Sequence, residues 1–154
     1  MPFVVEAAEG VLISSPLAGS MLLKAEAERT GGHFTLLENE VPAKAGPALH
    51  RHGNEDEMYY VLEGTFRFKL ADRIELAPPG AFVYIPMGTP HCFQNLGDEP
   101  GRLLVMFTPS GMERFFQGAA ALPPRPLDTE ARRALGRDCA MESLGPPLAI
   151  SDPL

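Results

Sequence analysis

Short apolar runs separated by turn residues dominate the chain between residues 10 and 108. Residues 65–70 alternate polar and apolar side chains, which is typical of a strand with one face toward solvent. Residues 58–62 and 81–85 are apolar on both faces, so we expect these two strands in the interior of the architecture. The predicted strands cover residues 11–14, 20–24, 33–41, 47–52, 57–62, 65–70, 73–76, 81–86, 91–96 and 102–108.

Gly, Pro, Asn and Asp residues punctuate these strands, and no helical pattern lies between them. Strands spaced in this way predict an all-β fold, either a sandwich or a closed barrel, rather than alternating strands and helices. The length of 154 residues fits one domain with one core. Within it we expect N-terminal strands over residues 1–34, the core of the fold over 35–110, and a helical extension with a tail over 111–154.

The pattern changes after residue 109. Ser110 can cap a short helix over residues 111–117, where Glu113 has the spacing of a capping box. Asp128 can cap a second helix that runs to about residue 142. A Gly-Pro-Pro sequence then ends that helix, and we expect the last residues to be loose.

The chain is acidic, with a formal net charge of −7 and a sequence pI of about 5.0. Such a surface repels a phosphate backbone and an anionic membrane, so neither nucleic acid nor membrane is an expected partner. No apolar run has the length of a transmembrane helix, and the first residues lack a positively charged start, so we expect a cytoplasmic protein. Cys92 and Cys139 are too few for a disulfide framework. They form a single bridge or, more simply, two free thiols.

Three histidines and one glutamate are spaced along the chain in a way that suits a metal site. His50 and His52 lie two residues apart on a predicted strand, so their side chains share one face while Arg51 points away. A turn follows, and Glu57 opens the next strand where a hairpin can return its carboxylate to the histidines. His91 follows a rigid, proline-containing turn. These residues form a ligand set for one divalent Fe, Mn, Co, Ni, Cu or Zn ion.

The same residues resemble the two sequence motifs of the cupin family. The first motif is matched by His50-x-His52-x4-Glu57-x6-Gly64, and the second by Gly80-x5-Pro86-x-Gly88-x2-His91-x3-Asn95. We expect Gly80 and Gly88 to adopt positive φ in turns, and Pro86 to stiffen the turn before His91. Lys44 stands where the first motif usually has Gly. We therefore expect Lys44 to have negative φ, with Gly46 or Pro47 making the turn instead.

The resemblance implies a double-stranded antiparallel β-barrel of the jelly-roll-like cupin type, with the metal inside near one mouth. It also implies His50, His52, Glu57 and His91 as ligands, Glu57 as a catalytic base, and a homodimer. Tyr59 shares strand parity with Glu57, and Phe93 with His91, so both are possible pocket residues. We place His33 at the surface or behind the ligands. Phe115 and Phe116 either pack the first C-terminal helix or cover the barrel mouth.

Residues 55–64 and 107–109 resemble small bacterial cupins grouped as quercetin-dioxygenase-like. This resemblance favours a metal-dependent oxygenase that acts on an aromatic, flavonol-like or polyketide-like small molecule. Two alternatives stay open: a non-oxidative cupin enzyme such as a polyketide cyclase or an isomerase, and a small-molecule-binding cupin without turnover. The identity of the metal and O₂ consumption discriminate between them.

Overall fold

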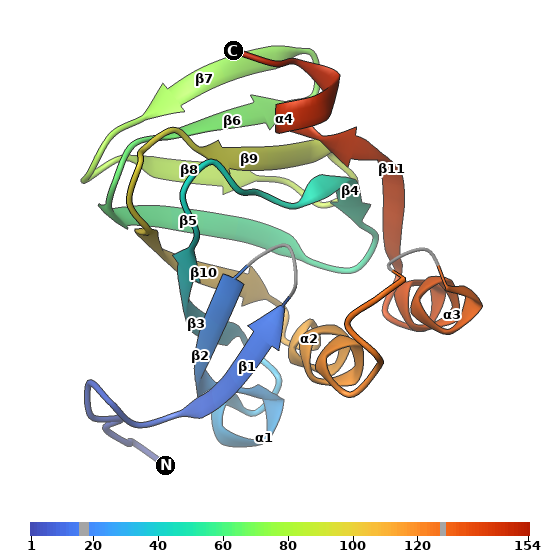
Figure 1. Ribbon diagram of the computed structural model, residues 1–154. Coiled ribbons are helices and arrows are strands. Elements are labelled where there is room, and N and C mark those ends of the chain that lie inside the picture. Colours follow the sequence, from blue (N-terminus) through green and yellow to red (C-terminus); the bar gives the residue numbers. More distant parts are fainter. Residues whose placement is uncertain (16–18, 127–128) are drawn as a thin grey trace.

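Two antiparallel sheets face one another in the computed structural model, which describes residues 1–15, 19–126 and 129–154 (Figure 1). The larger sheet has the strand order β1-β2-β3-β10-β5-β8, and the smaller has the order β11-β4-β9-β6-β7. The larger sheet comprises β1 (Val11–Ser15), β2 (Gly19–Ala25), β3 (Thr35–Val41), β10 (Gly101–Thr108), β5 (Asp56–Glu63) and β8 (Phe82–Ile85). The smaller comprises β11 (Met141–Pro147), β4 (Ala48–His52), β9 (His91–Asn95), β6 (Phe66–Leu70) and β7 (Arg73–Ala77). The predicted all-β, jelly-roll-like fold is confirmed.

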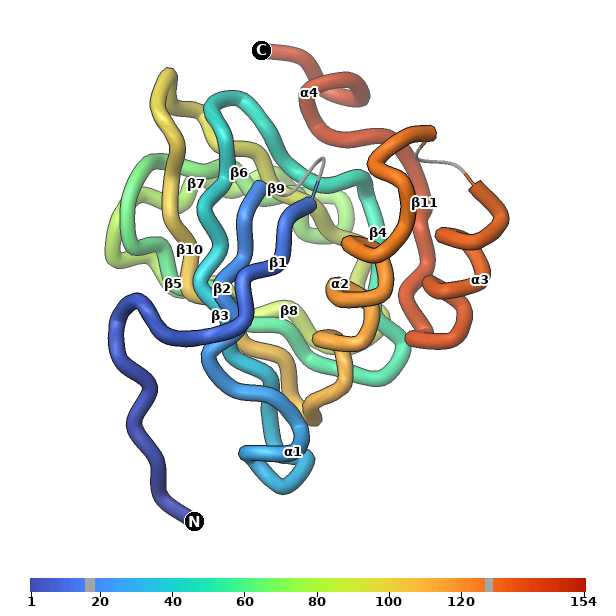
Figure 2. The backbone as a smooth tube through the Cα atoms, turned by 60° about the horizontal axis from the view of Figure 1, so that its bottom comes forward, coloured from blue at the N-terminus to red at the C-terminus, as the bar shows by residue number. Residues whose placement is uncertain are grey.

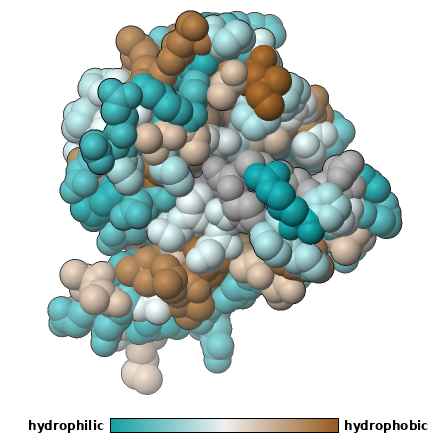
Figure 3. Space-filling model, in the orientation of Figure 1, coloured by the Kyte–Doolittle hydropathy of each residue, from teal (hydrophilic) through white to brown (hydrophobic). Residues whose placement is uncertain are grey.

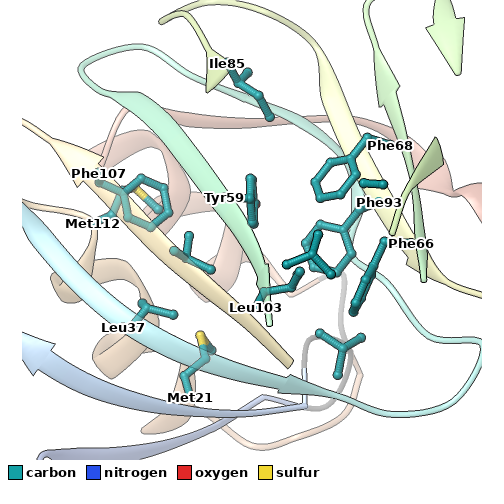
Figure 4. Packing of buried hydrophobic residues seen from close by; sticks show 14 of the residues in the cluster. Met21, Leu37, Tyr59, Phe66, Phe68, Ile85, Phe93, Leu103, Phe107 and Met112 are labelled. Carbon is teal, nitrogen blue, oxygen red and sulfur yellow. The ribbon is translucent and has the colours of Figure 1, made fainter. Parts of the chain in front are cut away.

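The hydrophobic core lies between the two sheets (Figure 4). On β10, Leu103, Val105 and Phe107 are buried while the residues between them are partly exposed, the alternation expected of a strand with one buried face. Phe66 and Phe68 of β6 pack against this layer from the smaller sheet. Both sheets therefore contribute side chains to the interior. The candidate metal ligands also come from strands of both sheets.

The outer face of the larger sheet corrects one expectation. We predicted that residues 58–62 and 81–85 are interior on both faces, yet Tyr60, Phe82 and Tyr84 are 45 %, 63 % and 51 % exposed. β5 and β8 have only one face toward the core, and β8 is the edge of its sheet. Apolar residues are also exposed over the β1–β2 hairpin and near β7 and α4 (Leu148–Ser151), on an otherwise mostly hydrophilic surface (Figure 3).

Helix α2 (Glu113–Ala120) begins later than predicted and is not capped by Ser110. Its N-cap is Met112, which makes no side-chain cap. The carboxylate of Glu113 is buried and accepts hydrogen bonds from the Gly111 N–H (2.9 Å), from the Ala27 N–H (3.0 Å) and from the Thr35 hydroxyl. Glu113 thus ties α2 to α1 (Ala27–Thr30) and β3, because its partners Ala27 and Thr35 belong to those two elements.

The C-terminal prediction is wrong beyond the second helix. Helix α3 (Glu130–Asp138) has Thr129 as its N-cap, whose hydroxyl accepts the Arg132 N–H, while Asp128 lies outside the described residues. The chain then leaves the helix and forms β11, which pairs with the open edge of β4. The Gly-Pro-Pro sequence lies within this strand, and Leu148 of α4 is fully buried. The segment is ordered because an unpaired sheet edge receives it, which no local pattern indicates.

Helix α2 lies at one end of the two-sheet structure, between β1 and β4, with α3 beside it (Figure 2). Helix α2 contacts β1 and α3, and α3 contacts β11. Among the helices that the structure describes, none is long and apolar enough to cross a membrane. Cys92 and Cys139 are free and buried.

Lys44 has φ of 62°, so the expectation of negative φ was wrong. The turn needs a left-handed residue where the family has Gly, and here Lys44 supplies it. Its ammonium group donates to the Leu96 carbonyl (2.6 Å) and pairs with Asp98 (2.9 Å). Gly46 has a different role, since a Cβ at that position would lie 1.8 Å from the carbonyl oxygen of Phe93. Gly80 and Gly88 do have positive φ, as predicted.

The left-handed backbone at Lys44 predicts a difference between two substitutions. Both Lys44→Asn and Lys44→Val lose the ammonium contacts, but asparagine tolerates positive φ and the β-branched valine does not. We expect Lys44→Val to be less stable than Lys44→Asn by about 1–2 kcal/mol. Urea unfolding followed by circular dichroism measures this difference. Equal free energies of unfolding for the two variants would contradict it.

Candidate metal centre and cavity

The four predicted ligands converge from both sheets. His50 and His52 come from β4 and His91 from β9, where His50 and His91 are directly paired across the strands. Glu57 comes from β5 in the other sheet. One ligand atom of each residue lies within 4.8 Å of those of the other three. The structure thus brings together all four residues as a cluster that could hold one metal ion.

Backbone carbonyls orient two of the imidazoles. Nδ1 of His50 lies 2.7 Å from the Ala48 carbonyl oxygen, and Nδ1 of His91 lies 2.8 Å from that of Thr89. A carbonyl only accepts hydrogen bonds, so Nδ1 of each ring is the protonated nitrogen. The lone pair of Nε2 is then directed toward the cluster, which is the arrangement that metal-binding histidines use.

His52 provides the test of whether these residues fit a metal. Its side chain is only 4 % exposed, and neither ring nitrogen makes a hydrogen bond within the described part of the chain. Nε2 lies 3.2 Å from Oε2 of Glu57, but the two groups are not aligned as donor and acceptor. A buried polar ring without a partner is costly, and buried polar atoms in folded proteins nearly always have one. A metal ion at the cluster would satisfy Nε2, so the residues fit.

Burial and mutual charge set the protonation of the cluster. Burial opposes ionisation of Glu57, but the neighbouring His52 and His91 outweigh it and hold the pKa of the carboxyl well below its usual range. Burial also opposes protonation of His91, but its hydrogen bond to Oε2 of Glu57 (2.7 Å) and the charge of Glu57 raise the pKa of His91. Burial, with His91 and His52 beside it, lowers the pKa of His50 to about 3. A proton shared by Glu57 and His91 therefore competes with a metal.

The raised pKa of His91 predicts that metal affinity depends on pH. His91 must be neutral to bind a metal, so affinity is full above its pKa and falls as the pH drops through and below it. We expect a loss of at least about tenfold per pH unit below that pKa, whereas His50 adds competition only in strong acid. Calorimetric titration with Zn²⁺ between pH 8 and pH 5 measures the slope. An affinity independent of pH would contradict a histidine site.

Tyr59 lies behind the carboxylate. Its hydroxyl donates to Oε1 of Glu57 at 2.5 Å, while Oε2 faces the histidines. Burial and the charge of Glu57 raise the pKa of Tyr59 well above its ordinary value, so the hydroxyl stays protonated and can only donate to the carboxylate. Sequence parity placed Tyr59 on the same face as Glu57 but did not indicate this hydrogen bond, which fixes the orientation of the carboxylate.

A cavity of about 1110 Å³ opens beside the cluster. His50, His52 and Glu57 form part of its wall, and His50 is only partly buried. Tyr59 and Phe93, the predicted pocket residues, both line it. Most of the remaining lining is apolar and includes Met21, Leu37, Val105, Phe107, Met112, Leu135 and Met141. Such a cavity suits a largely apolar small molecule.

The helices α2 and α3 supply one wall of this cavity. Phe115 and Phe116 of α2 line it and also pack on the core, so the two interpretations of this pair are compatible. Contributions from α3 and β11 were missed, because their positions depend on pairing with β4 rather than on a local pattern. His33 is exposed and is not part of the cluster.

Some buried polar atoms outside the cluster also have no hydrogen-bond partner among the described residues. They are Oδ1 of Asn39, Oε2 of Glu55 and Nε of Arg132. Asn39 and Arg132 line the cavity. Burial raises the pKa of the Glu55 carboxyl, and the nearby His52 offsets only part of this increase. None of the three was singled out from the sequence, since none of them belongs to a motif: Asn39 lies in β3, Glu55 in the turn before β5 and Arg132 in α3.

Comparison with known proteins agrees with this geometry. The family model of the cupin domain matches residues 37–107, the segment that contains all four cluster residues. Residues 37–107 are therefore a cupin domain, in agreement with the two sequence motifs. An uncharacterized protein of Methanocaldococcus jannaschii is 36 % identical over 70 residues, which are 46 % of this chain and 56 % of that protein.

Two further proteins that are similar to this chain have names that state a function. Quercetin 2,3-dioxygenase of Bacillus subtilis is 27 % identical over 119 residues, which are 76 % of this chain and 34 % of that protein. The chain thus spans about half or less of the length of the curated relatives it matches. The solved structure of the polyketide cyclase RemF from Streptomyces resistomycificus has 27 % sequence identity and a TM-score of 0.60, covering 70 % of this chain and 80 % of that one.

Proposed function

We propose that this cupin is a metal-dependent oxygenase that acts on an aromatic, flavonol-like or polyketide-like small molecule. The observation that carries the proposal is the position of the cluster. Three histidines and a glutamate form one cluster, and three of its members, His50, His52 and Glu57, lie in the wall of a large, mainly apolar cavity. Similarity to a quercetin 2,3-dioxygenase supports the choice of chemistry.

In this proposal His50, His52 and His91 hold one divalent metal ion, with Glu57 as a further ligand. When bound, Fe, Mn, Co, Ni or Cu supplies a Lewis acid and redox access to O₂, and Zn supplies a Lewis acid alone. The residues of the chain do the rest. Glu57 takes the proton of an acidic substrate hydroxyl, and Tyr59 keeps the carboxylate in place by donating to Oε1. The apolar cavity wall excludes water and orients the rings of the substrate.

A non-oxidative reaction is the second candidate. The similarity to the polyketide cyclase RemF favours it, since that structure matches most of this chain at 27 % identity. The same base, Glu57, would then remove a proton in an isomerisation or cyclisation, and O₂ would not be consumed.

Oxygen uptake tests the proposal. Metal-free protein is loaded separately with Fe²⁺, Mn²⁺, Co²⁺, Ni²⁺, Cu²⁺ or Zn²⁺ and mixed with quercetin or 3-hydroxyflavone. We expect O₂ consumption equimolar with flavonol loss for at least one of the redox-active ions, and none with Zn²⁺. Conversion of a polyketide-like substrate without O₂ uptake would instead support the second candidate. Absence of O₂ uptake with every metal would overturn the oxygenase proposal.

A further inference from the structure

Asn39 is a polar residue in the wall of the cavity. It occupies an inward-facing position of β3, is 4 % exposed, and lines the same space as the histidine cluster. The next inward-facing residues on either side of it, Leu37 and Val41, are apolar and buried. The chain thus places one amide where the strand pattern calls for a hydrophobic side chain.

The amide of Asn39 has no partner for its oxygen. Oδ1 is buried and makes no hydrogen bond with any residue that the structure describes. Leaving such a group unsatisfied is unfavourable, so it requires an explanation such as a ligand or an ordered water. An amide carries both an acceptor and a donor, and rotation about Cβ–Cγ turns either one toward the cavity. A hydroxyl group, which both donates and accepts, is the matching ligand group.

The strand register separates Asn39 from the metal site. On β10, Leu103 pairs with Asn39 and Phe107 pairs with Glu57, so the two residues lie four positions apart along the sheet. At about 3.3 Å per residue this is roughly 13 Å. A ligand held at the cluster by one end must therefore be elongated, with several rings, to bring a polar group to Asn39.

We infer that Asn39 determines ligand specificity by hydrogen-bonding a hydroxyl group at the end of an elongated aromatic ligand remote from the metal site. The inference rests on the proposed function, since it takes the cluster as the anchor for the other end of that ligand. It narrows the ligand class to polyhydroxylated aromatic molecules. An aromatic molecule of the same shape without the distal hydroxyls leaves the amide unpartnered and binds more weakly.

Two flavonols test this inference by binding alone. Quercetin and 3-hydroxyflavone share the same chelating hydroxyl and carbonyl, but only quercetin carries hydroxyls on the remote rings. Fluorescence titration of Ni²⁺-loaded protein without O₂ gives both dissociation constants. We expect the wild type to prefer quercetin by about tenfold or more, and Asn39→Leu to reduce the ratio to near one.

Met21→Leu is the matched control, because Met21 lies opposite Asn39 on β2, lines the same end of the cavity and carries no hydrogen-bonding group of comparable strength. It should shift both affinities alike and keep the preference. Asn39→Leu should also raise the melting temperature of the ligand-free protein, because it removes an unsatisfied buried amide. That measurement shows at the same time that the variant folds.

The outcomes separate the inference from the proposed function. If the wild type binds both flavonols equally, or if Asn39→Leu keeps the preference for quercetin, the inference is overturned while an aromatic ligand at the cluster stands. If the wild type binds neither flavonol, the proposed function fails and the inference fails with it.

Discussion

Substitution of His52 by alanine should abolish tight metal binding. His52 is buried and its Nε2 has no hydrogen-bond partner among the described residues, and a metal ion bound at the cluster would supply that partner. Changes to residues that only orient metal ligands lower affinity by about 10–100-fold, so removal of a ligand should cost on the order of 10²-fold or more. Metal analysis of the purified protein should show about one ion per chain in the wild type and far less in His52→Ala. Calorimetric titration with Zn²⁺ gives the affinities.

His33 provides the matched control for this experiment. It is the remaining histidine of the chain, is exposed, and does not belong to the cluster. His33→Ala should therefore bind metal with wild-type stoichiometry and affinity. Circular dichroism of metal-free His52→Ala checks that the fold is retained. Wild-type affinity in a folded His52→Ala protein would exclude His52 as a ligand.

Much of the candidate site could be predicted because it depends on strand parity. His50 and His52 are two residues apart, so any strand places them on one face, and their pairing with β9 brings in His91. Each predicted strand between residues 10 and 108 is present within a few residues of its expected bounds. The positions of these strands could therefore be predicted from the turn residues and the alternation of side chains in the sequence.

What could not be predicted depends on tertiary contacts. The pairing of β11 with β4 brings α3 to the cavity, and a Gly-Pro-Pro sequence gave no sign of a strand. Lys44 has positive φ because its turn needs a left-handed residue, and its ammonium group contacts Leu96 and Asp98, which lie more than fifty residues away. Asn39 interrupts the apolar positions of β3, and its proximity to the cavity follows only from the assembled sheets. In each case the cause is distant in sequence.

Glu57→Gln should separate the two roles of Glu57. The substitution keeps the size and one oxygen but removes the negative charge and the ability to take a proton. Since the charge of Glu57 and its hydrogen bond raise the pKa of His91, that pKa should fall in the metal-free variant. NMR titration of the His91 imidazole measures the fall without any substrate. An unchanged pKa would contradict an electrostatic coupling of Glu57 and His91 across their 2.7 Å contact.

The catalytic consequence of Glu57→Gln should be larger than its effect on metal binding. His50, His52 and His91 remain to hold the ion, so affinity should weaken while saturation stays attainable. At saturating metal, quercetin turnover should fall by a factor on the order of 10²–10⁴, because the base is lost. Tyr59→Phe is the control: it removes the hydrogen bond to Oε1 but keeps the carboxylate, so its rate should fall by about tenfold or less. Recovery of the wild-type rate in Glu57→Gln by added metal would mean that Glu57 is a ligand only. A wild-type rate together with unchanged metal affinity would refute both roles and leave a site of histidines alone.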